Sequence, residues 1–402
     1  MAGRARSGIA IAALLSGGLL LHPSGFARAA DAPDPALVQL GSDLFHDSDL
    51  SKNRTQACAT CHMPDAGFVD RRDLPDTGLA ASLGDDGTSI GTRNAPTASY
   101  AALSPRFHKN AEGKYVGGQF LDGRAATLEE QAGGPPLNPV EMGMPDKAAV
   151  VARLTENPDY QTRFAALFGA DIFGDTDRAY DAMTRAIAAF ERTPEFQPFD
   201  SRYDRALRGE IKLTDQEELG RVLFFSNQFT NCNLCHQLKA NGGQEGETFS
   251  NYQYHNIGVP ANPALNAVHD GGKPDLGLAE NPNVPDKDAQ AGKFKVPPLR
   301  NVGVTGPYMH NGVFKDLRTV ILFYNKYNSI AKRRQINPET GKEWDPPEVA
   351  ANISLTELET GPALDDKRID ALVAFLKTLT DERYEALQAE IDAEAAASAA
   401  GK

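Results

Sequence analysis

Two short cysteine motifs constrain this chain more than any other feature of its sequence. Cys58-Ala59-Thr60-Cys61-His62 and Cys232-Asn233-Leu234-Cys235-His236 share the pattern Cys-x-x-Cys-His and together use all 4 cysteines. Two thiols within one turn can bond the two vinyl groups of a haem, while the adjacent imidazole reaches the iron from the proximal side. The alternative is one zinc site closed by both cysteine pairs, but zinc does not require a histidine directly after each pair. The motifs therefore predict two covalently bound c-type haems, with His62 and His236 as iron ligands.

The length of 402 residues suits about two domains. One motif lies near the start of each half, and a proline-containing linker over residues 193–199 separates the halves. We therefore expect a mainly α fold of two cytochrome-c-like haem domains, residues 31–196 and residues 197–402. Long irregular loops should join their helices, and the haems should face the domain interface.

Residues 1–30 have the pattern of a secretory signal peptide. Arg4 and Arg6 precede an apolar run over residues 9–21, and Ala27-Arg28-Ala29 supplies a small-x-small cleavage site. The apolar run is too short to span a bilayer comfortably, so the pattern predicts export without a membrane anchor. Haem attachment after export is typical of the bacterial periplasm, which is the location that we expect.

The chain is acidic, with a formal net charge of −13 at pH 7. Loss of the leader would remove three arginines and no acidic residue, which makes the mature chain more acidic still. An acidic surface repels phosphate backbones and anionic lipids. The charge therefore argues against nucleic acid and membrane as partners.

The segments around the two motifs resemble each other. Leu-Gly-x-x-Leu-Phe precedes each motif, at residues 40–45 and 219–224, and Thr214 with Glu217 forms a capping box before the second copy. A second echo pairs Asp122-Gly123 and Leu128 with Asn311-Gly312 and Leu317, and a third pairs Arg93-Asn94 with Arg300-Asn301. Helices are expected over residues 146–168, 176–190, 316–327 and 365–378, with mostly loop over residues 63–107 and 237–298. From Asp381 onward we expect a solvated helix that frays into a disordered tail.

The loop after the first motif lacks a strong iron ligand. No histidine or methionine follows Met63 until His108. The His62 haem therefore should keep an open face, as binding of peroxide or dioxygen requires.

Several longer motifs resemble the bacterial di-haem cytochrome c peroxidase superfamily, and within it the MauG-like branch that serves methylamine utilisation. The motifs are Gly91-Thr92-Arg93-Asn94-Ala95-Pro96-Thr97, Asp122-Gly123-Arg124, Asn138-Pro139-Val140-Glu141-Met142, Phe294-Lys295-Val296-Pro297-Pro298-Leu299-Arg300-Asn301 and the stretch from Thr305 to Tyr327. The resemblance covers nearly the whole mature length.

The resemblance implies a tyrosine ligand at the second haem. Ordinary di-haem peroxidases place a methionine there, whereas MauG-like chains place a tyrosine, and the matching residue is Tyr324. A phenolate favours oxidised iron, and a thioether favours reduced iron. From the residues alone, Met309 and His310 compete for this role, and Tyr324 could equally be a residue at a helix–core boundary.

The resemblance also places Gln131, Pro135 and Glu141 in the distal pocket of the first haem. Glu141 would move a proton between the oxygens of peroxide. Asn94, Thr305 and Pro307 match the family's calcium ligands, and oxygen donors suit that cation. From spacing alone, Glu141 could be a surface residue and the calcium residues could be ordinary turn residues.

Two tryptophan positions of MauG-like chains are altered. The tryptophan that usually precedes Asp-Gly-Arg is Leu121, and the one near the second motif is Thr230, although the neighbouring Asn231 matches. Trp344 is the only tryptophan. Since both positions are linked to charge relay in the family, the relay route here is open.

The resemblance implies a periplasmic oxidase that completes tryptophan tryptophylquinone (TTQ) on the precursor of methylamine dehydrogenase. It would use hydrogen peroxide, or dioxygen plus electrons from a periplasmic donor, through a high-valent di-haem state and long-range electron transfer. The alternative enzyme is a cytochrome c peroxidase fed by a small cytochrome or cupredoxin. A third possibility, a pure electron carrier, would need strong ligands on both faces of both irons.

Overall fold

The computed structural model describes residues 33–239, 243–269 and 271–400, together with Met1 and Gly3. The predicted leader, apart from those two residues, lies outside the described part. Contacts divide the chain after Asp34, and Pro35–Lys402 forms one compact unit. The division predicted at residue 196 stays a prediction. In the described ranges no helix has both the length and the apolar character needed to cross a membrane.

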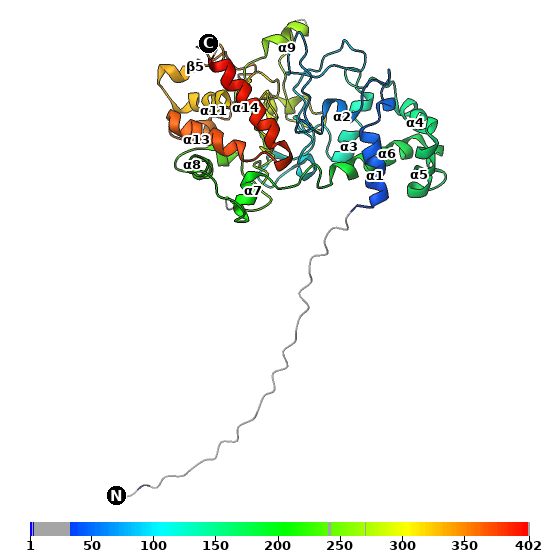
Figure 1. Cartoon of the computed structure of the whole chain (residues 1–402), viewed down its shortest axis with the longest axis horizontal. Coiled ribbons are helices and arrows are strands. Elements are labelled where there is room, and N and C mark those ends of the chain that lie inside the picture. The colour runs from blue at the N-terminus through cyan, green and yellow to red at the C-terminus, as the bar shows by residue number, and fades with distance from the viewer. Residues whose placement is uncertain (2, 4–32, 240–242, 270, 401–402) are drawn as a thin grey trace. The chain divides into compact units, whose positions relative to one another are not determined.

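Helices dominate the unit, and long irregular segments join them (Figure 1). The helices are α1 (Pro35–Phe45), α2 (Cys58–Cys61), α3 (Leu128–Ala132), α4 (Lys147–Glu156), α5 (Pro158–Phe168), α6 (Thr176–Glu191), α7 (Arg202–Leu207), α8 (Asp215–Phe224), α9 (Pro263–Val268), α10 (Lys287–Gln290), α11 (Leu317–Asn325), α12 (Leu355–Leu358), α13 (Asp366–Lys377) and α14 (Glu385–Ala400). Short antiparallel ribbons pair β1 (His108–Lys109) with β2 (Tyr115–Val116), β3 (Tyr254–His255) with β4 (Phe294–Lys295), and β5 (Ile336–Asn337) with β6 (Lys342–Glu343).

The helix predicted over residues 146–168 is two helices. Pro158 has no N–H to continue a helix, and Asn157 is extended and caps α5 by accepting from Asp159 N at 3.0 Å. The other three predicted helices are observed as α6, α11 and α13. Thr214 and Glu217 form the predicted capping box at the start of α8.

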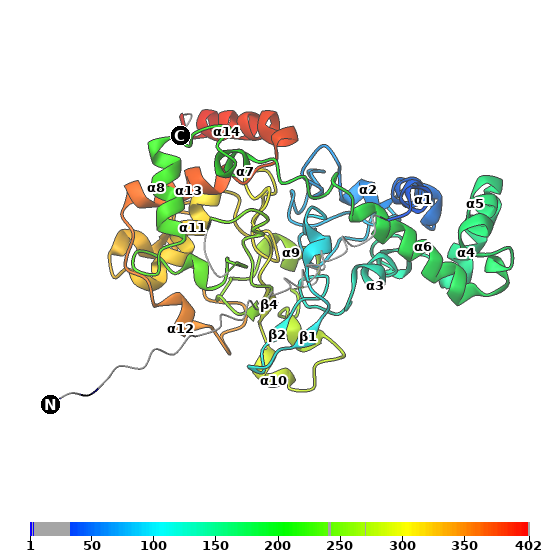
Figure 2. The same ribbon diagram turned by 90° about the horizontal axis from the view of Figure 1, so that it is seen from below.

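Two similar helix pairs organise the unit. α1 packs on α6 and α8 packs on α13, at opposite ends of the ribbon diagram in both views (Figure 2). Each crossing depends on a glycine: a methyl group at Gly41 would lie 1.9 Å from Ala186 O, and one at Gly220 would lie 1.9 Å from Ala371 O. The two glycines of the Leu-Gly-x-x-Leu-Phe repeat therefore allow the same close approach of two helices.

Each pair builds a separate apolar core. The first core lies between Leu40 and Phe196 in sequence and includes Phe45, Phe164 and Phe190. The second lies between Tyr203 and Leu379 and includes Phe224, Leu322 and Phe375. Each core therefore draws its residues from one half of the chain.

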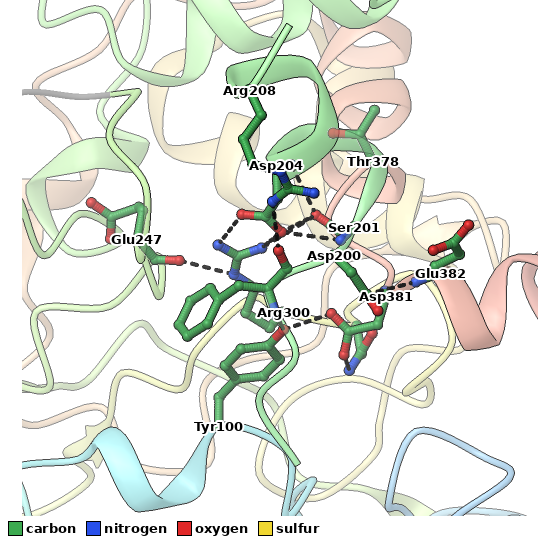
Figure 3. A network of polar contacts seen from close by, with 12 residues as sticks. Tyr100, Asp200, Ser201, Asp204, Arg208, Glu247, Arg300, Thr378, Asp381 and Glu382 are labelled. Carbon is green, nitrogen blue, oxygen red and sulfur yellow. Dashed lines mark hydrogen bonds and ion pairs between the residues drawn. The ribbon is translucent and has the colours of Figure 1, made fainter. Parts of the chain in front are cut away.

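A buried ion pair lies beside the second core (Figure 3). Arg300 is 1% exposed, and its Nη1 and Nη2 bind the two carboxylate oxygens of Asp204 at 2.5 and 3.0 Å. Its Nε donates to Glu247 O at 2.9 Å. The rings of Tyr100, Phe199, Tyr203 and Phe249 surround the guanidinium. A bidentate, ring-enclosed pair of this kind fixes four segments that are distant in sequence.

The solvated helix expected from Asp381 onward is observed as α14, but the residues that precede it are buried or bonded rather than solvated. Asp381 is buried, accepts from Tyr100 Oη at 2.6 Å and from Asn301 Nδ2 at 2.8 Å, and has its pKa raised by burial to about 6. Tyr384 Oη donates to Pro64 O at 2.8 Å, and Arg383 donates to the same carbonyl. We call residues 381–388 the C-terminal strap, because they tie the end of the chain to the loop after the first cysteine motif.

Candidate haem site

One cavity of about 850 Å³ is lined by both cysteine motifs. Cofactor sites typically occupy about 300–1,000 Å³. Every residue predicted to bind haem, to form the distal pocket or to bind calcium lies on its wall. These residues are Cys58, Cys61, His62, Asn94, Gln131, Pro135, Glu141, Cys232, Cys235, His236, Thr305, Pro307 and Tyr324.

The two motifs share one main-chain hydrogen bond, although the first is a short α-helix and the second a 3₁₀ turn. His62 N donates to Cys58 O at 2.9 Å, and His236 N donates to Cys232 O at 2.9 Å. This helical turn places residues three and four apart on one face. Each motif therefore presents its two thiols and its imidazole to the same side, as attachment to one haem requires.

Main-chain carbonyls orient both imidazoles. His62 Nδ1 donates to Phe68 O at 3.1 Å, and His236 Nδ1 donates to Phe249 O at 3.0 Å. A carbonyl only accepts, so Nδ1 carries the hydrogen and Nε2 keeps its lone pair for a metal. Burial lowers the pKa of His62 and lowers that of His236 to about 4, which favours the neutral, ligating form.

The four cysteines are two separate pairs of protonated thiols. Burial raises the pKa of Cys61 to about 11 and that of Cys235 to about 12, so both stay thiols. In the part of the chain that the structure describes, no three His, Cys, Asp or Glu side chains converge on a metal-binding position. The two cysteine pairs therefore do not close one zinc site.

Tyr324 stands on the cavity wall at a position that corresponds to Pro135. Gly123 and Gly312 have φ values of 69° and 64°, and α3 and α11 begin at the same register after them. Continuing this register aligns Pro135 with Tyr324. Burial raises the pKa of the Tyr324 phenol, so an adjacent cation would be needed to stabilise its phenolate.

The two competing ligands have different surroundings. His310 stacks on the Phe294 ring with centroids 3.8 Å apart, and its Nε2 lies 3.4 Å from Glu348 Oε2. This imidazole also lines the cavity, and among the described residues its Nε2 has no hydrogen-bond partner, so His310 stays a competitor. Met309 lines the cavity as Tyr324 does and remains a competitor.

The predicted distal residues lie close together. Gln131 is in α3, Pro135 begins the following short 3₁₀ turn, and Met142 N donates to Pro135 O at 3.3 Å, which brings Glu141 beside that turn. Burial raises the pKa of Glu141, while the Arg124 charge and an Asn138 hydrogen bond oppose the rise. The carboxyl group therefore holds a proton more tightly than an exposed glutamate does.

The predicted calcium ligands come from both halves of the chain. Asn94 N donates to His310 O at 2.8 Å, and Asn94 Nδ2 donates to Leu79 O at 3.0 Å, which leaves the amide oxygen as the ligand atom. The main-chain carbonyls of Thr305 and Pro307 accept no hydrogen bond from the described residues, so both oxygens are available to a cation. These donors are neutral oxygens, which calcium accepts together with water.

The altered tryptophan positions lie on the same wall. Leu121 O accepts from Lys295 N at 2.8 Å, and Thr230 Oγ1 donates to Leu223 O at 2.6 Å. Trp344 packs against Phe314 and Phe323 in the second half and does not itself line the cavity. Trp344 therefore does not replace either missing indole by position.

Sequence reasoning missed polar residues on the cavity wall. Glu191 ends α6, is 5% exposed and has its pKa raised by burial to about 8. His255 and Lys295 lie in β3 and β4. The sequence did contain a signal for Glu191, because this charged residue continues the apolar helix face formed by Ile187 and Phe190.

Comparisons with known proteins identify the family of the chain. Residues 35–212 match the family model described as di-haem cytochrome c peroxidase. The chain is 56% identical to methylamine utilization protein MauG of Paracoccus denitrificans, over 92% of this chain and 95% of that protein. It is 35% identical to the cytochrome c peroxidase Ccp of Escherichia coli, over 73% of this chain and 54% of that protein. The solved structure of the diheme peroxidase BthA from Burkholderia thailandensis has a TM-score of 0.76 and 34% identity, and the match covers 88% of this chain and 87% of that one.

Proposed function

Because this chain belongs to the di-haem cytochrome c peroxidase family, we propose that it is a periplasmic oxidase that completes TTQ on the precursor of methylamine dehydrogenase. The family makes it an oxidoreductase and implies two haems. The proposal adds the substrate, the location and covalent attachment through the two cysteine motifs. It also keeps the domain division at residue 196, which the two separate cores support.

The residues on the cavity wall fit two haems. Each motif offers two protonated thiols and a neutral imidazole whose Nε2 is free to ligate. When bound, the haems would supply the redox chemistry that consumes hydrogen peroxide or dioxygen and draws electrons from a protein substrate. A residue inside another protein cannot enter this cavity, so its electrons must travel through the chain.

One observation carries the choice of substrate: Tyr324 lines the cavity at the register of Pro135. An oxygen ligand at that position would favour oxidised iron in the second half. The second haem would then share oxidising equivalents rather than only deliver electrons.

The other side chains have separate roles in this proposal. Glu141 moves a proton between the oxygens of hydrogen peroxide, and Gln131 and Pro135 shape the space around it. Asn94 with the carbonyls of Thr305 and Pro307 binds calcium and joins the two halves.

A second candidate is peroxide reduction with electrons from a small cytochrome or cupredoxin. Thr230 favours it, because a threonine cannot replace a tryptophan in relaying charge to a protein substrate, whereas Leu121 counts against both candidates. The identity with the Escherichia coli peroxidase is compatible with either candidate.

One experiment separates the two candidates. The holoprotein is mixed with hydrogen peroxide and either the precursor of methylamine dehydrogenase or a reduced small cytochrome. The oxidase proposal expects quinone absorbance from the precursor and slow oxidation of the cytochrome. Rapid cytochrome oxidation without quinone absorbance would select the peroxidase instead.

A further inference from the structure

Lys295 is a buried cation on the cavity wall. It ends β4, is 8% exposed, and donates from Nζ to Gly118 O at 2.5 Å. Its main-chain N–H donates to Leu121 O, so the residue from the second half is anchored on a loop of the first half. A lysine ammonium has three N–H donors, and one main-chain acceptor leaves two of them for another group.

The nearby carboxylate is already paired. The negative charge of Asp122 acts to raise the pKa of Lys295. The Oδ2 atom of Asp122, however, lies 2.5 Å from Arg93 Nη1 and 2.9 Å from Arg124 Nη1, so this carboxylate already pairs with two arginines. Within the described ranges, no carboxylate forms an ion pair with Lys295. Burial lowers the pKa of Lys295 to about 8, so the ammonium is still the main form at neutral pH. A buried charge is costly unless an anion pairs with it.

The cavity offers one class of anion in the right place. Haem carries two propionate carboxylates, and both haems of this family have to occupy the cavity that Lys295 lines. We propose that Lys295 binds a propionate carboxylate of one of the two haems, at the point where the halves of the chain meet. This inference depends on haem binding and not on quinone formation. The pairing of Lys295 with a propionate and the proposed oxidase activity can therefore fail independently of each other.

Reduction potentials test this pairing. Lys295→Met removes the charge with little change in length, and loss of a positive charge beside a propionate favours ferric iron. The midpoint potential of one haem should fall in spectroelectrochemical titration of the holoprotein, without peroxide or protein substrate. Lys293→Met is the matched control, because Lys293 donates to Gln290 Oε1 and does not line the cavity. It should leave both potentials unchanged.

The remaining outcomes are equally decisive. Lys295→Arg keeps the positive charge and should restore the midpoint potential of the affected haem. In haem with isotope-labelled propionates, the carboxylate stretching frequency of this variant should differ from that of the native protein in redox-difference infrared spectra. Equal potentials in Lys295→Met and the native protein, or an unshifted stretch in Lys295→Arg, would overturn the proposal. A native potential that changes when chloride is exchanged for a larger anion would assign Lys295 to a free anion instead.

Discussion

Tyr324 and Pro135 show how one register can carry different side chains in the two halves of a chain. Both lie on the wall of one cavity, and both follow a glycine with positive φ and the start of a helix. A proline side chain cannot ligate iron, whereas a phenol can. The two halves therefore differ at this position in side-chain chemistry and also in backbone, because Tyr324 lies within α11 whereas Pro135 begins a 3₁₀ turn after α3 has ended.

The Tyr324→Phe variant should keep both haems attached and lose the distal ligand of the second one. The ferric optical and EPR spectra should change for that haem alone, because only its ligand field loses an oxygen. Tyr327→Phe is the matched control, since Tyr327 Oη donates to Ile257 O at 2.9 Å. Unchanged spectra in Tyr324→Phe would transfer the role to Met309 or His310, which also line the cavity.

The Glu141→Gln variant should slow the reaction with peroxide by about 10²–10⁴-fold, the usual contribution of a positioned proton-transfer group. Accepting the first proton requires the carboxylate form. Because burial raises the pKa of Glu141, the native rate should fall as pH drops through that raised value, and the variant should lose this dependence. Stopped-flow measurements across pH test both statements, and an equal rate in the variant would exclude Glu141.

The Asp204→Asn variant should lower the free energy of unfolding by about 3–5 kcal/mol, because it leaves the Arg300 charge buried and unpaired. Denaturant titration measures this change. Glu210→Gln removes a carboxylate from the exposed pair with Arg208 and should change stability little. Similar stabilities for the two variants would show that the buried pair is not critical.

At the scale of elements, the two helix crossings follow from the local Leu-Gly-x-x-Leu-Phe sequence. The third echo of the internal repeat could not be aligned correctly from local sequence. Tyr100 and Asn301 have φ values of 59° and 61°. The N–H of Tyr100 donates to Phe196 O, which follows α6, and the N–H of Asn301 donates to Leu379 O, which follows α13. These residues are structural counterparts. The predicted pairing of Arg93-Asn94 with Arg300-Asn301 is therefore wrong in register. It depended on a shared Arg-Asn dipeptide, whereas the correct match depends on backbone geometry that the sequence does not show.

The Gly220→Ala variant should destabilise the fold by about 1–3 kcal/mol, the usual cost of overpacking. The added methyl group would meet the Ala371 carbonyl at 1.9 Å, so α8 and α13 must separate. Gly174→Ala is the control, since nothing lies within 4 Å of a methyl group there. Thermal unfolding of the holoproteins compares them, and equal midpoints would mean that the crossing adjusts freely.

At the scale of the molecule, short-range patterns predicted far more than long-range ones. The cysteine motifs, the capping box at Thr214 and three helices depend on residues that are neighbours in sequence. The C-terminal strap was not predicted, because Arg383 and Pro64 are 319 residues apart. Nothing in either segment alone indicates the other. Residue roles at the cavity came from resemblance to a family rather than from spacing.

Chelation of calcium should disturb the spectra of both haems together. The predicted ligands Asn94, Thr305 and Pro307 come from the two halves, so removing the ion would loosen the contact between them. Optical and EPR spectra before and after verified calcium removal test this, with calcium addition as the reversal. Identical spectra would refute the structural role.

The C-terminal strap has a consequence for the order in which the protein matures. A chain is synthesised and exported from its N-terminus, so the first cysteine motif emerges long before Arg383 and Tyr384. The loop at Pro64 cannot make its final hydrogen bonds until the end of the chain arrives. If the chain is exported and binds haem covalently, as we propose, the first motif is synthesised early but gains its contacts with the C-terminal strap late. Its thiols would then stay open to the attachment machinery during export.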